Sequence, residues 1–460
     1  MMRNYLQRTI VTFASLLIFT ALTAQAQSGS TRPRRATSRQ TTTKTDKSST
    51  STDKSSEPLL DVEPANSGNS NSARRNTARS TTDSNAPLLN TTASTPVGAP
   101  VSNDNNTAPV SNSNAASDTS HAFTLLQGKQ YAAALKEARQ VTLSNPSDSE
   151  AWKIAGFAEI NLKQYEAATT DLQKALDLQR AAKQEDPFTV DALGHAYFLA
   201  EKFDRALPLL VITTTRKDAK PDATTLYYRA VSEYQLHKPA DAERTFNSIV
   251  KDNPKDAASL FYLGQIAFER NDMDAAIASL NRATLSDTRL VSAWNLLTLA
   301  YLQRAATATV PEKADADYLN AVRAGEGLTR VRTDAPANVL FAQALIGAKQ
   351  FPRAATVLER FATAPDASPS ALYLLGVAES RAKNFPKAIS ALERAAAKTP
   401  DDANIYRELG YAYEVSKQYA KALAVYEKGA SLAPNDTDFK ESAERVRPDR
   451  SLLRQPATKA

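Results

Sequence analysis

The chain has 460 residues, enough at about 100–200 residues per domain for two or three domains or one long array. It has no cysteine, which excludes disulfide scaffolds, thiolate metal sites and cysteine nucleophiles. With only three histidines, we expect no imidazole-rich metal centre. The net charge of +6 is spread along the sequence, so we expect no nucleic-acid binding. The composition therefore predicts a helix-rich, non-catalytic protein.

Residues 1–26 have the pattern of a secretory signal peptide. Arg3 and Arg8 precede a mostly apolar run from Ile10 to Leu22, and Ala24-Gln25-Ala26 follows as a small-x-small cleavage site. The run is shorter than the roughly 20 residues that a membrane-spanning helix needs. We expect cleavage after Ala26, no membrane span in the mature chain, and a periplasmic or secreted protein of a bacterium. An uncleaved membrane anchor is the alternative.

The segment 27–117 is of low complexity. From residue 28 to residue 120 the sequence contains no Phe, Trp, Tyr, Ile or Met and is dominated by Ser, Thr, Asn, Ala and Pro. Such a segment buries too little apolar surface to offset the entropy of ordering it. We expect a disordered arm at 27–117, and a disordered tail at 448–460.

From residue 118 onward, small and aromatic residues recur with a period near 34, which is typical of a repeat protein. Small residues at position 8 of each repeat would let two antiparallel helices approach closely, as would alanines at position 20. Proline at position 32 would end the second helix, since it donates no backbone hydrogen bond. The residues that define the repeat are Trp152 and Trp294 at position 4, Gly156, Gly194, Gly264, Gly376 and Gly410 at position 8, Ala422 at position 20 and Pro434 at position 32.

This pattern resembles the tetratricopeptide repeat (TPR). The segment Tyr406-Arg-Glu-Leu-Gly-Tyr-Ala-Tyr413 is similar to the family's W-x2-L-G-x2-Y, and several columns agree across most of nine copies. The resemblance implies an all-α, right-handed superhelical solenoid of about nine helix–turn–helix repeats over residues 118–436. The polar-backed segment 437–447 is expected to be the capping helix that such an array needs.

Two departures from the period stand out. Extra residues lie within Arg180–Asp186, between the second and third repeats, and the sixth repeat is expected to be interrupted at Ala305–Pro311 before a helix longer than usual.

In the family, the first helix of each repeat lines a concave groove that usually binds an extended peptide or another protein. Eight rings of this chain fall at the corresponding positions: Phe157, Phe198, Tyr227, Tyr234, Phe261, Phe268, Tyr373 and Tyr411. Tyr227 and Phe261, and Tyr234 and Phe268, lie 34 residues apart, so these four would form a ladder across repeats four and five. Alternatively, some of the rings simply pack against the neighbouring repeat.

Sites for catalysis or cofactors are not predicted. His195 and Asp191 lie one helical turn apart and are expected to form a hydrogen-bonded surface pair rather than a metal site, which would need more ligands. No H-E-x-x-H, G-x-S-x-G, Walker or G-x-G-x-x-G motif occurs in the sequence. We expect no enzyme activity, no metal and no cofactor.

The function that this pattern favours is an exported TPR scaffold that mediates protein–protein interaction through its groove. Envelope assembly, secretion and polysaccharide export are the settings we consider. One alternative is a periplasmic carbohydrate-binding scaffold whose rings stack on sugars. Another is a membrane-anchored or self-associating structural protein.

Overall fold

The structure is a computed structural model of the whole chain, and it describes residues 119–217 and 221–447. The predicted signal peptide, the predicted arm at 27–117 and the predicted tail at 448–460 lie outside the described residues. In the described part the chain forms nineteen helices and no strand, which confirms the all-α class.

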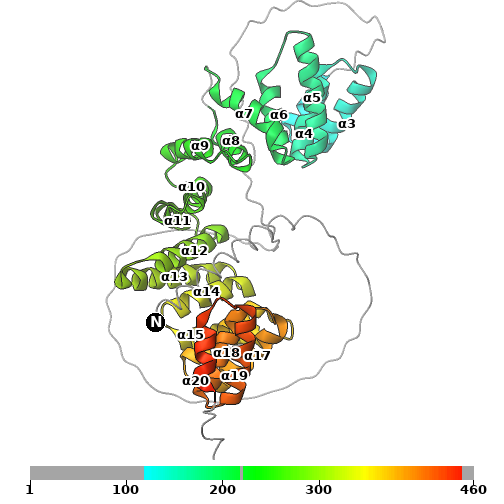
Figure 1. Ribbon diagram of the computed structural model, residues 1–460. Helices are drawn as coiled ribbons and strands as arrows, with labels where there is room; N and C mark the ends of the chain where they lie inside the picture. Colours follow the sequence, from blue (N-terminus) through cyan, green and yellow to red (C-terminus); the bar gives the residue numbers. More distant parts are fainter. Residues whose placement is uncertain (1–118, 218–220, 448–460) are drawn as a thin grey trace, which may run out of the picture. The chain divides into compact units, whose positions relative to one another are not determined.

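The helices form nine successive pairs followed by one last helix, α20 (Thr437–Val446), and Figure 1 labels most of them. The first helices of the pairs are α2 (Thr119–Gln127), α4 (Ser149–Asn161), α6 (Pro187–Leu199), α8 (Ala223–Gln235), α10 (Ala257–Glu269), α12 (Val291–Thr307), α14 (Ala335–Gly347), α16 (Pro369–Arg381) and α18 (Ala403–Val415). The second helices are α3 (Tyr131–Ser144), α5 (Tyr165–Ala181), α7 (Phe203–Thr215), α9 (Pro239–Asp252), α11 (Met273–Ser286), α13 (Pro311–Val331), α15 (Phe351–Ala362), α17 (Phe385–Lys398) and α19 (Tyr419–Leu432).

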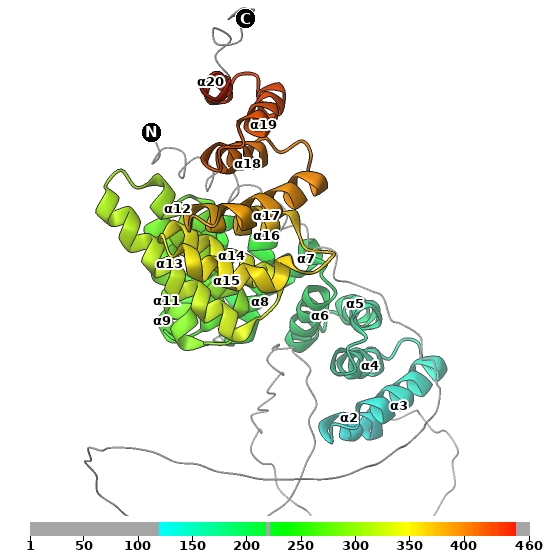
Figure 2. The same ribbon diagram turned by 90° about the horizontal axis from the view of Figure 1, so that it is seen from below.

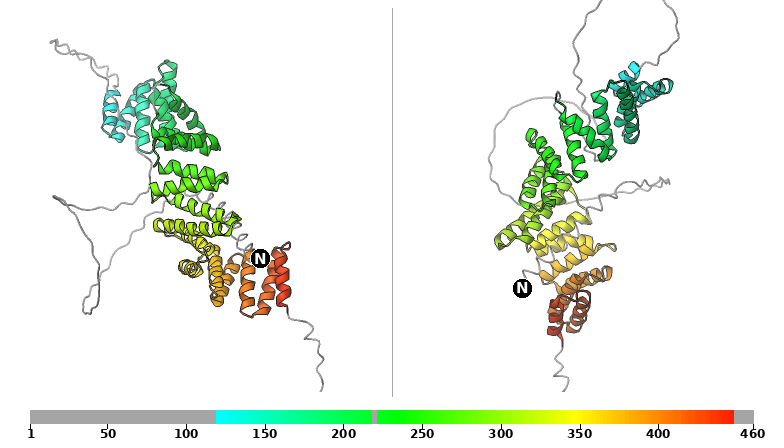
Figure 3. Two further views of the ribbon diagram at one scale, coloured as in Figure 1. Left: turned by 90° about the vertical axis from the view of Figure 1, so that its left-hand side faces the viewer. Right: turned by 45° about the horizontal axis from the view of Figure 1, so that its top comes forward.

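Each helix packs against the next one along the chain, and most first helices also contact the first helix of the preceding pair. Helices α8 and α10 meet through the side-chain rings of Tyr227, Tyr234 and Tyr262. Figure 2 shows α2 beside α3, and Figure 3 shows the pairs following one another in sequence order. Contacts therefore join neighbouring pairs, which is the arrangement of a repeat protein.

Aspartates begin most of the first helices. The side chain of the N-cap residue accepts a hydrogen bond from the first turn at Asp148, Asp186, Asp222, Asp256, Asp334 and Asp402, and Ser368 does the same for α16. These bonds satisfy backbone donors that have no partner within the helix. The caps fix where each repeat starts.

The turns within the pairs are built on a residue in the left-handed conformation. It is a lysine in five of them, for example Lys383 with φ of 68° and Lys417 with φ of 60°. In the last pair, the amides of Lys417 and Gln418 donate to Glu414 O and Tyr413 O, which closes the end of α18. The turn therefore needs a strained residue at one position.

Glycines at position 8 lie where the two helices of a pair touch. A Cβ atom added to Gly156 would lie 2.4 Å from Leu172 Cγ, and one added to Gly376 would lie 2.4 Å from Leu392 Cγ. Both leucines belong to the second helix of the same pair, so the helices approach too closely for any side chain there.

Position 4 ties the loop between repeats to the next first helix. Trp152 Nε1 donates to Pro146 O at 2.9 Å, Trp294 Nε1 donates to Thr288 O at 2.9 Å, and Tyr406 Oη donates to Pro400 O at 2.9 Å. The aromatic residue at this position therefore bonds to the carbonyl six residues earlier in three different repeats.

The two expected departures have different structural forms. The extra residues after the second repeat lengthen α5, which runs for 17 residues to Ala181. The expected interruption at Ala305–Pro311 is wrong in its extent, because α12 continues to Thr307 and only Ala308–Val310 separates it from α13. Helix α12 has 17 residues and α13 has 21, so both are long. The sequence predicted the greater length of α13.

The long pair is fixed to both neighbours. Arg304 on α12 donates to Asp317 on α13 at 2.9 and 2.6 Å and to Asp274 on α11 at 2.6 Å. Lys349, in the turn after α14, binds Asp315 on α13 at 3.1 Å. The longer helices therefore continue the array rather than break it.

The buried apolar residues fall into four clusters along the chain. The largest runs from Leu302 to Val446, two smaller ones cover α8–α13 and α4–α8, and the smallest joins α2, α3 and α4 through Ala122, Ala138, Ile154 and Ala155. The apolar core is thus distributed over the repeats.

None of the helices in the two described ranges combines the length and the apolar composition that crossing a membrane requires.

Candidate binding surface on the first helices

Seven of the eight rings expected in a groove keep part of their surface accessible. The half-buried rings are Phe157 on α4, Phe198 on α6, Tyr227 and Tyr234 on α8, Phe261 and Phe268 on α10, and Tyr411 on α18. Four of them come from the adjacent helices α8 and α10. We call Tyr227, Tyr234, Phe261, Tyr262 and Phe268 the ring cluster.

The prediction for the eighth ring, Tyr373, is wrong. Tyr373 on α16 is 2 % exposed and is among the largest fully buried side chains. It lies against the charged residues that join repeats eight and nine, and its burial raises the pKa of its hydroxyl. Tyr373 is therefore a packing residue and offers no surface to a ligand.

The contacts of the ring cluster run through a residue that the predicted ladder omitted. The ring of Tyr262 meets those of Tyr227, Tyr234 and Phe261 at 6.2, 5.5 and 5.4 Å between centroids. It also stacks on the buried Phe246 at 4.9 Å with an interplanar angle of 6°. Tyr262 thus fixes the exposed rings to the core of α9 and α10.

Sequence reasoning could have found Tyr262. It lies 34 residues after Tyr228, so these two rings obey the same period as the predicted ladder, one position further along each helix. Tyr228 is buried and stacks on Phe198 at 4.0 Å. Part of the aromatic pattern is therefore inter-repeat packing, as the alternative interpretation allowed.

A polar group borders the ring cluster. Tyr234 Oη donates to Glu269 Oε1, and Gln265 Nε2 donates to Tyr234 Oη at 2.7 Å and to Glu269 Oε1 at 3.2 Å. Burial, followed by the bond to Glu269, raises the pKa of Tyr234, so its hydroxyl keeps its proton at neutral pH. This hydroxyl is a donor that orients the carboxylate.

The remaining two rings lie in other repeats. Phe157 packs against the cluster of α4–α8. Tyr411 lies 5.5 Å from the guanidinium of Arg381, which also forms a two-pronged ion pair with Glu408 at 3.0 and 2.9 Å. Four of the seven accessible rings expected in the groove therefore lie in repeats four and five.

His195 does not form the expected surface pair with Asp191. It is buried on α6, its Nε2 lies 2.8 Å from Thr225 Oγ1, and its ring meets Tyr228 edge-on at 5.0 Å. Asp191 instead binds Arg216 at 3.0 Å. Burial lowers the pKa of His195, so it is a neutral packing residue.

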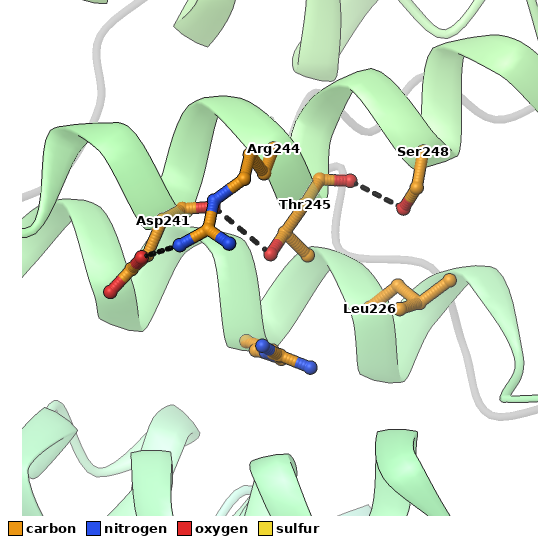
Figure 4. Close-up of a pocket in the computed structure, with 6 residues that line it drawn as sticks. Leu226, Asp241, Arg244, Thr245 and Ser248 are labelled. Atoms are coloured by element: carbon orange, nitrogen blue, oxygen red, sulfur yellow. Dashed lines mark hydrogen bonds and ion pairs between the residues drawn. The ribbon is translucent and has the colours of Figure 1, made fainter.

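A surface pocket of about 180 Å³ lies between α8 and α9 (Figure 4). Its six lining residues are Leu226, Arg229, Asp241, Arg244, Thr245 and Ser248. Their polar groups bind one another and Glu233: Arg229 binds Glu233 at 2.7 Å, Thr245 donates to Glu233 at 2.7 Å, and Arg244 pairs with Asp241. Since both arginines already have carboxylate partners, we assign no ligand to this pocket.

Within residues 119–217 and 221–447, no group of three or more acidic or histidine side chains is placed to hold a metal ion.

A sequence model of the tetratricopeptide repeat family matches residues 227–288, 339–403 and 379–437. The matches fall on helix pairs with the same period, and the same pairing extends through α2–α19. Residues 227–288 and 339–437 are therefore identified as tetratricopeptide repeats. A comparison with curated protein sequences finds no match.

Solved structures of TPR proteins resemble parts of this chain. MamA from Desulfovibrio magneticus RS-1 is 21% identical, covering 39% of this chain and 97% of that one, with a TM-score of 0.34. YrrB, described as a TPR protein with an unusual peptide-binding site, is 17% identical over 44% and 97% of the two chains, with a TM-score of 0.36. The C-terminal part of a TPR protein from Cytophaga hutchinsonii is 14% identical over 64% and 99%, with a TM-score of 0.39. These likenesses say nothing of what this chain binds.

Proposed function

We propose that this TPR protein is an exported scaffold that binds an extended peptide segment of another protein across α8 and α10. The observation that carries the proposal is the half-buried ring cluster, in which Tyr262 contacts Tyr227, Tyr234 and Phe261 and stacks on the buried Phe246. Rings held in place lose little conformational entropy on binding and offer a large apolar contact area. Apolar side chains of an extended peptide fit such a surface.

The experiment is a crosslinking capture from cells with the wild type and the double variant Phe261→Ala/Phe268→Ala. These two rings are half-buried, so the substitutions remove contact surface while Tyr262 still covers Phe246. Tyr419→Ala is the matched control, because this ring is 50 % exposed but lies on a second helix. We expect one protein to be captured by the wild type and the control and lost from the double variant, with unchanged circular dichroism for all three.

Capture of the same proteins by all three chains would overturn the proposal.

A second experiment tests the carbohydrate alternative, in which the wild type and the double variant are applied to immobilised neutral glycans. Glycan binding that only the wild type shows would replace the peptide with a carbohydrate ligand.

Export rests on the pattern of residues 1–26. We expect mass spectrometry of the chain recovered from the periplasm or medium to find Gln27 at its N-terminus. An N-terminus that retains Arg3 and Arg8 in the membrane fraction would mean an anchored scaffold instead.

A further inference from the structure

The charged side chains of the first helices are almost all neutralised within the array. In the described part of the chain, the Lys, Arg, Asp and Glu residues of α4, α6, α8, α12, α16 and α18 each have an ion-pair partner. Helix α14 has no charged residue. The exception is Glu269, at the end of α10, which is exposed and forms no ion pair.

The partners of Glu269 are neutral groups that orient it. Tyr234 and Gln265 both donate to its Oε1 atom, and neither donates to Oε2. The neighbouring cation, Arg270, is bound to Glu243 at 2.9 Å and lies 3.8 Å from Asp272. Among the described residues the carboxylate therefore has no cationic partner, and its Oε2 atom can accept a further donor.

The rings beside Glu269 add a second feature that favours a cation. Tyr234 and Phe268 occupy the same position in repeats four and five, and both are half-buried. A guanidinium or ammonium group is attracted to the face of such rings and forms charge-assisted hydrogen bonds with a carboxylate. Other first helices also have exposed rings, such as Phe123 on α2 and Phe188 on α6, but the carboxylates of the other first helices are in ion pairs.

From this charge complementarity we infer that the peptide bound at the ring cluster carries a basic side chain, lysine or arginine, which binds Glu269. Its stem lies against Tyr234 and Phe268, and its apolar neighbours in the peptide occupy the remaining rings. Arginine fits better than lysine, because its planar group can bond the carboxylate while it stacks on a ring. The inference rests on the proposed function, since it names the chemistry of the ligand at the same surface.

The test is a selection from a displayed library of random nonapeptides with the full chain as bait. The baits are the wild type, Glu269→Gln and Glu393→Gln. Glu393 is the matched control, because it is also exposed and also accepts a hydrogen bond from a tyrosine, Tyr413, but lies on the second helix α17. Peptides selected by the wild type are then resynthesised with the basic residue replaced by norleucine.

We expect the wild type and Glu393→Gln to enrich peptides with one Lys or Arg at a fixed distance from apolar residues. Glu269→Gln should bind these peptides about tenfold more weakly, as should the wild type with the norleucine peptides. The two changes together should cost little more than either alone, because they remove the same contact.

Two results separate this inference from the proposed function. If the wild type selects peptides without basic residues, or if Glu269→Gln binds the basic peptides as tightly as the wild type, the inference is overturned and peptide binding stands. If the wild type selects no peptide at all, the proposed function fails.

Discussion

At the scale of single residues, the contact between the two helices of a repeat depends on glycine. Gly376 faces Leu392, and Gly410 faces Tyr426, whose Cε1 atom would lie 2.4 Å from an added Cβ. Close-packed interiors do not absorb an extra methyl group without displacement.

We therefore expect Gly376→Ala to lower the free energy of unfolding by about 1–3 kcal/mol, as for other overpacked cores. Urea denaturation followed by circular dichroism measures it. Gly128→Ala is the control, since the nearest atom to its added Cβ, Thr124 O, lies 3.4 Å away. Equal stability of the two variants would contradict the close approach.

A buried acidic pair in the second repeat gives a pH effect. Glu159 on α4 and Asp171 on α5 are 1 % and 2 % exposed, and both bind Arg139 on α3 at 2.7 Å. Burial, followed by the charge of Asp171, raises the pKa of Glu159 to about 7, while Arg139 opposes the shift. One arginine does not neutralise two carboxylates, so the pair retains a proton.

Because the folded state binds this proton and the unfolded chain releases it near the ordinary pKa of 4.5, stability falls as the pH rises from about 4.5 to about 7. We expect Glu159→Gln to remove this loss and to gain about 1–3 kcal/mol over the wild type at pH 8. Hydrogen exchange of α3–α5 at pH 5 to 8 measures it, with the exposed Glu166→Gln as control. The pKa of His195 is lowered in the folded state, so its contribution to stability increases as the pH rises. The wild type and the Glu159→Gln variant are therefore compared with each other at each pH.

These residue-scale features differ in how far the sequence predicts them. The glycines recur at a fixed position, so their role follows from the period. Glu159, in contrast, occupies position 11, where the similar motif at residues 406–413 has Tyr413, and nothing in the sequence places Arg139 or Asp171 beside it. Pairings across repeats depend on side-chain geometry that a period does not contain.

At the scale of the helices, the turn inside every pair except α12–α13 contains a residue in the left-handed conformation. Lys383 has φ of 68°, a conformation that glycine adopts at no steric cost and lysine at about 1 kcal/mol. The side chain is exposed, so it contributes little to packing.

We expect Lys383→Gly to raise the free energy of unfolding by about 0.5–1 kcal/mol. The same substitution inside a helix, Lys174→Gly on α5, should lower it by about 1 kcal/mol, because there glycine only adds freedom to the unfolded chain. Opposite shifts of the urea midpoint are the expected result. A loss of stability for both would mean that the lysine side chain matters at the turn.

The helices were predictable because small and aromatic residues recur at fixed positions in most pairs. The lengths of the helices were not predictable. In the segment Ala305–Pro311, where a break was expected, three residues continue α12 and a short turn follows before α13 begins. Ala305-Ala-Thr contains no residue that ends a helix, and Pro311 occupies the first position of α13, which proline tolerates. Proline marks where a helix starts here, rather than where the previous one stops.

At the scale of the whole array, α20 covers the apolar end of the last pair. Phe439 is 1 % exposed and lies against Gly429, and its ring is 4.7 Å from the guanidinium of Arg407. The buried stripe of α20 is completed by Ala443 and Val446. Without this helix, the surface of α19 would face water.

We expect Phe439→Ala to cost about 3–5 kcal/mol in the stability of the last repeat, as for other buried phenylalanines. Faster hydrogen exchange in α18 and α19, with concentration-dependent mass in light scattering, would report the opened end. Lys440→Ala, one residue along and exposed, is the control. Unchanged exchange in the phenylalanine variant would show that α20 is not a cap.

The array as a whole was predictable from its period, and so was the place of the ring cluster. For the proposed binding surface, the sequence prediction has one wrong member and one omission. Tyr373 has the register of a groove residue but is covered by its neighbours, and Tyr262 has the register of a core residue but anchors the exposed rings. The position of a residue in the repeat determines the helix face on which it lies. Its burial depends in addition on which side chains pack against that face.

The uneven division of the apolar core has a consequence for how the chain is made. The smallest cluster lies at α2–α4 and the largest reaches from Leu302 to Val446. Among the described helices, those of the smallest cluster are therefore synthesised first, and the largest cluster is complete only once α20 has been synthesised.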